Sequence, residues 1–214
     1  MFSSYSRLVS KGDYQDTYWK GAVMRSVIEL TRIIEFAVIA LAYTLGYLLV
    51  NYIVAPVQYL YLSRDFTVGS LLFIPHGIRV LAVWLCGSRA ILPLIIAEFL
   101  CTVLLWQPDV ALSVSLGSAM VGGLCVYLTF EVFRLAGIEM RPDGKDSALT
   151  NWKSLILLAS IASVFNSVGK QIFFGGLAPL ADEVLILGIF WIGDTLGTFA
   201  CLLLLIGIRR RFQF

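Results

Sequence analysis

The chain has 214 residues, of which 59% are hydrophobic and only 14% are charged, and its mean hydropathy is +0.86. A soluble domain carries roughly 25% charged residues and cannot bury this much apolar surface, so the composition excludes an ordinary water-soluble fold. The net charge of +2 does not indicate an acidic partner such as a nucleic acid. We therefore expect an all-α, polytopic transmembrane bundle whose surroundings are a lipid bilayer.

Six apolar stretches are predicted to form membrane-crossing helices, each of which needs about 20 apolar residues to cross the hydrocarbon core. In chain order these predicted spans are Ile33–Val54, Val68–Gly87, Ala90–Trp106, Val110–Ala136, Trp152–Phe174 and Glu183–Gly207. The first is predicted to end before Pro56. The second and third are short, contain Pro75 and Pro93, and could be tilted, kinked or partly re-entrant.

The distribution of Lys and Arg predicts the orientation. With six spans, thirteen of the sixteen basic residues fall on one side of the membrane, Arg64 falls alone on the other, and Arg79 and Lys170 lie within spans. Cytoplasmic loops carry the excess of basic residues, so both termini are predicted to be cytoplasmic. The thirteen are Arg7, Lys11, Lys20, Arg25, Arg32, Arg89, Arg134, Arg141, Lys145, Lys153, Arg209, Arg210 and Arg211.

This topology divides the chain into three parts. Residues 1–27 form a predicted N-terminal arm, which could lie along the cytoplasmic headgroups or be a plain disordered tail. Residues 28–208 form the transmembrane helical domain, and residues 209–214 form a basic cytoplasmic tail.

Two opposite charges are predicted to meet inside the membrane. The second and third spans are joined by the turn at Gly87–Arg89; Arg79 lies nine residues before Ser88 and Glu98 ten residues after it. On antiparallel helices this places both side chains roughly 14 Å from the cytoplasmic side. A charge at that depth is costly, so we expect an ion pair. It could be purely structural or belong to a proton or anion site.

A second polar group is predicted in the outer half of the bundle. Asn166 and Lys170 lie one helical turn apart on the fifth span, and Trp191 and Asp194 lie on the sixth, where Gly193 and Gly197 are predicted to leave space for a pocket. Counting along the helices places Asp194 nearer in depth to Asn166 than to Lys170, although the lysine side chain could reach and pair with the carboxylate. With His76 opposite, Asn166, Lys170, Trp191 and Asp194 are predicted to line a ligand pocket, because polar groups inside a membrane mark functional sites. Packing of satisfied polar groups is the alternative.

The sequence offers little support for a metal site or an enzyme. His76 is the only histidine, and Cys86, Cys101, Cys125 and Cys201 form no CxxC pair, so we predict buried free thiols and no metal centre. No nucleophile–base constellation is apparent either, so we expect no catalytic residue and no enzyme activity. The pattern does not specify a cofactor.

Two segments resemble a known family. The run LFIPHGIR at Leu72–Arg79, followed by LCGSRA at Leu85–Ala90, is similar to a segment of MASE-type membrane-associated sensor domains (the first-described class), and FWIGDTLG at Phe190–Gly197 is similar to their W-x-G-D-x-x-G segment. The resemblance implies a sensory module of the bacterial cytoplasmic membrane. Such domains normally carry a cytoplasmic output domain, whereas seven residues follow Gly207 here, so we expect this chain to signal through another polypeptide.

Three functions remain open from the sequence. The first is a sensor-like module that binds a small ligand or a partner membrane protein within a larger complex. The second is a small transporter or substrate-capture subunit. The third is a structural accessory subunit of a respiratory or photosynthetic membrane assembly.

Overall fold

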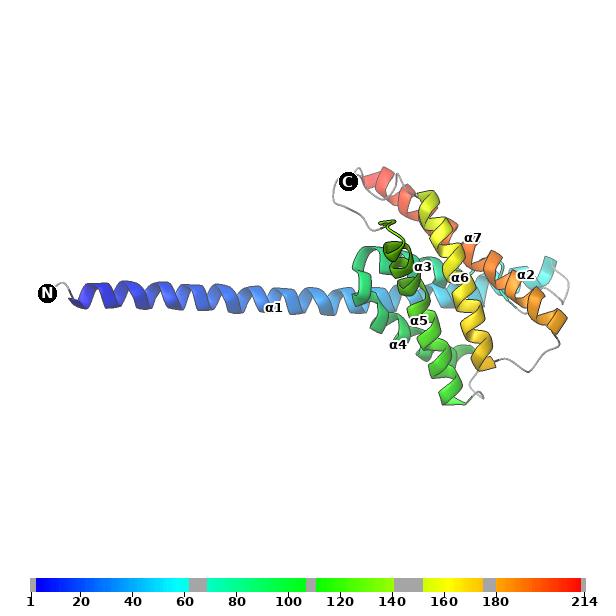
Figure 1. Ribbon diagram of the computed structural model, residues 1–214, viewed down its shortest axis with the longest axis horizontal. Helices are drawn as coiled ribbons and strands as arrows, with labels where there is room; N and C mark the ends of the chain where they lie inside the picture. The colour runs from blue at the N-terminus through cyan, green and yellow to red at the C-terminus, as the bar shows by residue number, and fades with distance from the viewer. Residues whose placement is uncertain (1–2, 62–68, 107–110, 141–151, 175–179, 213–214) are drawn as a thin grey trace. The chain divides into compact units, whose positions relative to one another are not determined.

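The computed structural model describes the backbone of residues 3–61, 69–106, 111–140, 152–174 and 180–212, and every regular element in these ranges is helical. The helices are α1 (Ser3–Leu49), α2 (Ala55–Tyr61), α3 (Ile74–Cys86), α4 (Ile91–Cys101), α5 (Leu112–Leu135), α6 (Trp152–Phe174) and α7 (Leu180–Phe212), shown in Figure 1. Short π-helical segments, η1 (Val50–Val54) and η4 (Thr102–Trp106), follow α1 and α4. A 3-10 turn, η3 (Gly87–Ala90), joins α3 to α4.

Five helical stretches of the described residues are long and apolar enough to cross a membrane. They are Val23–Tyr61, Ile74–Leu105, Leu112–Leu135, Trp152–Phe173 and Val184–Arg211. Each covers the roughly 20 residues that a membrane crossing requires. The chain is therefore an all-helical, multi-pass membrane protein.

The stretch Ile74–Leu105 is not straight. In a continuous helix, Arg79 and Glu98 would lie about 28 Å apart along the axis, yet their side chains are in contact, with Arg79 Nη2 2.6 Å from Glu98 Oε2. The reversal occurs at η3, where Gly87 has a φ of +61°, a conformation open to glycine. The chain thus folds back between α3 and α4.

The three prolines act differently from what the sequence predicted. The first helix does not end before Pro56: it continues to Tyr61 through η1. The wider π-helical turn of η1 lies just before Pro56, whose ring would clash with the preceding turn of a regular α-helix. The second helix begins at Ile74 rather than at Val68, which lies outside the described residues. Pro75 therefore occupies the first turn of α3, and Pro93 the first turn of α4. Neither breaks a helix, because prolines suit these positions.

The chain divides into two compact units, Met1–Val38 and Ile39–Phe214. The first unit is the N-terminal part of α1, whose described residues carry mostly exposed side chains. The second unit contains the helical bundle, in which α5 packs against α4 and α6, and α7 packs against α3 and α6. Its apolar core includes Tyr43, Val83, Leu94, Val126 and Leu158, all fully buried.

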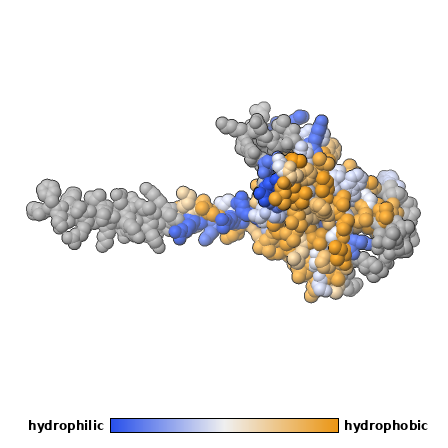
Figure 2. Space-filling model, in the orientation of Figure 1, coloured by the Kyte–Doolittle hydropathy of each residue, from blue (hydrophilic) through white to orange (hydrophobic). Residues whose placement is uncertain are grey.

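The surface of the bundle is apolar and its interior is partly polar. Large exposed side chains include Leu41, Leu100, Leu157 and Leu203, and Figure 2 shows apolar residues covering most of the visible face of the bundle. The buried residues include Arg79, Glu98 and Asp194. An apolar exterior around buried charges suits a protein surrounded by lipid.

Candidate functional site

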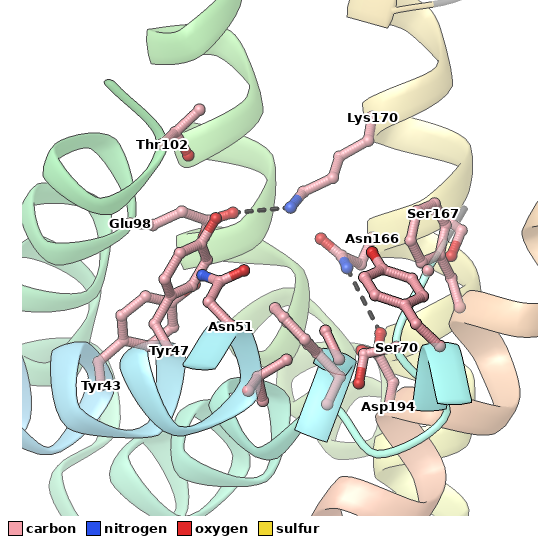
Figure 3. Close-up of a pocket in the computed structure, with 16 residues that line it drawn as sticks. Tyr43, Tyr47, Asn51, Ser70, Glu98, Thr102, Asn166, Ser167, Lys170 and Asp194 are labelled. Carbon is pink, nitrogen blue, oxygen red and sulfur yellow. Dashed lines mark hydrogen bonds and ion pairs between the residues drawn. The ribbon is translucent and has the colours of Figure 1, made fainter. Parts of the chain in front are cut away.

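An ionic network centred on Glu98 lies between three helices of the second unit. The Glu98 side chain on α4 is 2% exposed and contacts two cations. Arg79 Nη2 on α3 lies 2.6 Å from Oε2, and Lys170 Nζ on α6 lies 2.7 Å from Oε1. Figure 3 shows the lysine reaching across to the carboxylate. The structure thus brings together the predicted pair Arg79 and Glu98, and adds a third charge that the sequence analysis assigned elsewhere.

Aromatic side chains from α1 and from the residue just before α3 lie close to the guanidinium of Arg79. Its Nη2 donates a hydrogen bond of 2.8 Å to the Tyr43 hydroxyl, and its Cζ lies 5.3 Å from the centroid of the Tyr43 ring and 5.9 Å from that of Phe73. Cations are stabilised over aromatic faces, more so in a desolvated site. The buried arginine is therefore held by a carboxylate, a hydroxyl and two rings.

Asp194 on α7 is the centre of a second, separate polar cluster. Its Oδ2 accepts a 2.7 Å hydrogen bond from Ser163 Oγ and a 3.4 Å bond from Asn166 Nδ2. His76 Nδ1 lies 3.4 Å from the same oxygen, and His76 Nε2 lies 3.1 Å from the carbonyl oxygen of Ala159. The predicted pairing of Lys170 with Asp194 is absent, because the lysine contacts Glu98 instead.

The Asp194 cluster does not have the order of a hydrolytic triad. In a triad the serine hydroxyl contacts the histidine and the carboxylate orients the ring from the other side. Here Ser163 and His76 contact the same oxygen of Asp194, and the far nitrogen of His76 is occupied by a backbone carbonyl. This arrangement fixes the carboxylate rather than activating a nucleophile.

A cavity of about 130 Å³ lies between the two clusters. Its walls come from α1, η1, α2, the segment before α3, α4, η4, α6 and α7. Glu98 and Lys170 line one part of it, and Asn166 and Asp194 another (Figure 3). Tyrosine and phenylalanine side chains supply much of the remaining wall. The volume is close to that of the engineered cavity of about 150 Å³ that holds benzene, so a small organic molecule fits.

Three buried polar atoms of cavity-lining residues have no hydrogen-bond partner among the described residues. They are Oε2 of Glu98, which forms an ion pair with Arg79, Oδ1 of Asn166 and Oγ of Ser167. Most buried polar atoms in native proteins are satisfied, by protein groups or by water. These three atoms have almost no accessible surface, so the polar atom that borders the cavity with a free hydrogen-bonding capacity is the amine of Lys170.

The five predicted pocket residues have different positions. Asn166, Lys170 and Asp194 line the cavity. His76 lies behind Asp194, fully buried and outside the cavity wall. Trp191 is a correction: its side chain is 45% exposed, and its Nε1 donates a 2.7 Å hydrogen bond to Ser160 at the outer edge of the α6–α7 contact. Trp191 therefore faces away from the cavity.

The sequence analysis missed the contribution of the first helix. Tyr43, Tyr47 and Asn51 line the cavity from α1 and η1. They are spaced four residues apart, which places them on one face of a helix. This polar and aromatic stripe within an apolar span was the signal that could have identified them.

The glycines near Asp194 also have a different role. They were predicted to leave space for the pocket, but backbone fills this space: Gly193 faces Ser70, and Gly197 faces Phe73. The Phe73 amide donates a 2.9 Å hydrogen bond to the Gly193 carbonyl. The glycines therefore dock the segment before α3 onto α7.

Within the described ranges, no group of three His, Cys, Asp or Glu side chains could hold a metal ion. Cys86, Cys101, Cys125 and Cys201 form no disulfide among the described residues. Comparison of the chain with protein-family models, curated proteins and solved structures found no match.

Proposed function

We propose that this chain is a sensor-like membrane module that binds a small ligand in the cavity beside Lys170 and acts together with a partner membrane protein. The observation that carries the proposal is the cavity lined by Glu98, Lys170 and Asp194 within an apolar-surfaced bundle. Ligand sites are typically such concave, largely apolar spaces with a few convergent polar groups. The resemblance to MASE-type sensor domains favours a sensory role and a partner.

The cavity argues against the purely structural alternative. A site that served packing alone would gain stability by being filled, since interiors are close-packed and voids are destabilising. Here a charged side chain, Lys170, borders an open space. A substrate-capture subunit would need the same cavity, so a binding measurement does not distinguish it from a sensor. A measurement of uptake of the bound compound does.

Ligand retention tests this proposal. We expect native mass spectrometry of the protein, purified in mild detergent, to detect a small molecule that Ser167→Leu loses, because a leucine side chain at this cavity-lining position fills the space. Val164→Leu is the matched control on the same helix, since Val164 is 47% exposed. A wild-type protein that retains no small molecule but co-purifies with a stoichiometric partner would support the structural alternative instead.

We also propose six spans, with α3 and α4 as two of them, and both termini in the cytoplasm of a bacterial cell. The basis is the thirteen-to-one distribution of Lys and Arg outside the spans. In a variant lacking the four native cysteines, we expect a cysteine at position 64 to react with an impermeant thiol reagent from outside, and cysteines at positions 144 and 213 to be protected. Labelling of position 144 from outside would overturn this topology.

A further inference from the structure

We infer that the cavity takes a small organic monoanion, with its carboxylate on Lys170. This inference rests on the proposed ligand-binding function and specifies the chemistry of the ligand. Two observations carry it: the hydrogen-bonding of His76 and the charges around the cavity.

The contacts of His76 determine the charge of the Asp194 cluster. The carbonyl oxygen of Ala159 can only accept a hydrogen bond, so the Nε2 atom 3.1 Å away carries a hydrogen. In a neutral ring the buried Nδ1 would then be an acceptor, and it faces another acceptor, Asp194 Oδ2, at 3.4 Å. One additional proton removes this conflict, whether it resides on the imidazole or on the carboxyl group.

Either position of this proton gives the same net charge. A protonated His76 beside an ionised Asp194 sums to zero, and so does a neutral ring beside a carboxylic acid. The other groups hydrogen-bonded to Asp194 are Ser163 and Asn166, which are uncharged. The Asp194 side of the cavity is therefore electrically neutral, although it contains a carboxyl group.

The Glu98 side of the cavity is not neutral. Arg79 and Lys170 supply two positive charges and Glu98 one negative charge, and the Tyr43 hydroxyl that contacts Arg79 is uncharged. The 2.7 Å distance between Lys170 and Glu98 is that of a charge-assisted hydrogen bond, which indicates a protonated amine. Among the described residues the two clusters thus carry a net charge of +1.

An uncompensated positive charge inside a membrane is costly and is neutralised by binding an anion. Lys170 is the accessible cation: it lines the cavity and is 21% exposed, whereas Arg79 is fully buried. Its ammonium group has three donors, of which one is used on Glu98. A ligand carboxylate can accept the others.

A small carboxylic acid suits both the charge and the volume of the cavity. A short hydroxy acid is monoanionic near pH 7 and fits about 130 Å³.

Binding of matched probes tests this inference. The purified protein would be titrated by calorimetry with lactate, with its neutral analogue lactamide, and with alanine as a zwitterion of similar size. We expect lactate to bind, and lactamide and alanine to bind at least tenfold more weakly. We also expect Lys170→Gln to weaken lactate binding roughly ten- to hundredfold, as losing a charged hydrogen bond does, and Lys170→Arg to retain most of it. Lys153→Gln removes an exposed lysine from the same helix and serves as the control.

The outcomes separate this inference from the proposed function. Equal binding of lactamide and lactate, or no effect of Lys170→Gln in a variant that melts like the wild type, overturns the monoanion and leaves a ligand-binding cavity. Retention of a neutral or cationic compound on purification would likewise overturn the monoanion and leave a ligand-binding cavity. No binding of any probe together with no retained molecule overturns both.

Discussion

Replacing Glu98 with glutamine is expected to destabilise the protein by about 3–5 kcal/mol, which is the usual cost of removing one partner from a buried ion pair. The carboxylate is 2% exposed and is shared by Arg79 and Lys170. A neutral amide would leave two cations near one another without an anion. Thermal unfolding of the purified variant in detergent measures the effect.

A double-mutant cycle isolates the interaction with Arg79. Glu98→Gln leaves Arg79 and Lys170 without an anion, and Arg79→Met leaves Glu98 paired with Lys170 alone. The double variant leaves only Lys170 without an anion, so we expect it to cost less than the sum of the singles. Arg134→Gln is the control: Arg134 pairs with Glu131 at 2.6 Å but its side chain is 56% exposed, and such exposed pairs contribute little to stability. Strict additivity of the two buried replacements would show that the charges do not neutralise each other.

The depth of a side chain in the membrane was more predictable from the sequence than the neighbouring helix that the side chain faces. Arg79 and Glu98 were placed at one depth by counting from the turn, which works because a short connection between antiparallel helices fixes their register. The same counting placed Asp194 nearer to Asn166 than to Lys170, and these two are hydrogen-bonded. Counting does not give the rotation of a helix about its axis relative to its neighbours.

The unpredicted rotation of each helix about its axis explains the two wrong predictions at the site, for Lys170 and Trp191. Lys170 reaches α4 instead of α7, and Trp191 faces the surface although it lies three residues from Asp194. Both depend on which helices pack together, and α6 lies against both α5 and α7. The cavity residues of α1 were missed for the same reason, since nothing in the span itself shows that its tyrosine stripe faces Glu98.

The other large effect is expected at the closest contact between α7 and the segment before α3. A Cβ added at Gly197 would overlap the carbonyl oxygen of Phe73 and lie 2.9 Å from the nitrogen of Ile74. Both obstacles are backbone atoms, which cannot rotate away as a side chain can. The helices would have to separate, and such overpacking costs about 1–3 kcal/mol, occasionally more.

The same helix provides the control for this prediction. No described atom lies within 4 Å of a Cβ built at Gly207, so Gly207→Ala should be neutral or stabilising by up to about 1 kcal/mol, because alanine is the better helix former. We therefore expect Gly197→Ala to melt well below Gly207→Ala. The Phe73 ring lies over Arg79, so displacing this segment should also weaken ligand binding at Lys170. If the two variants melt alike, the close contact between α7 and the Phe73 backbone does not exist in the folded protein.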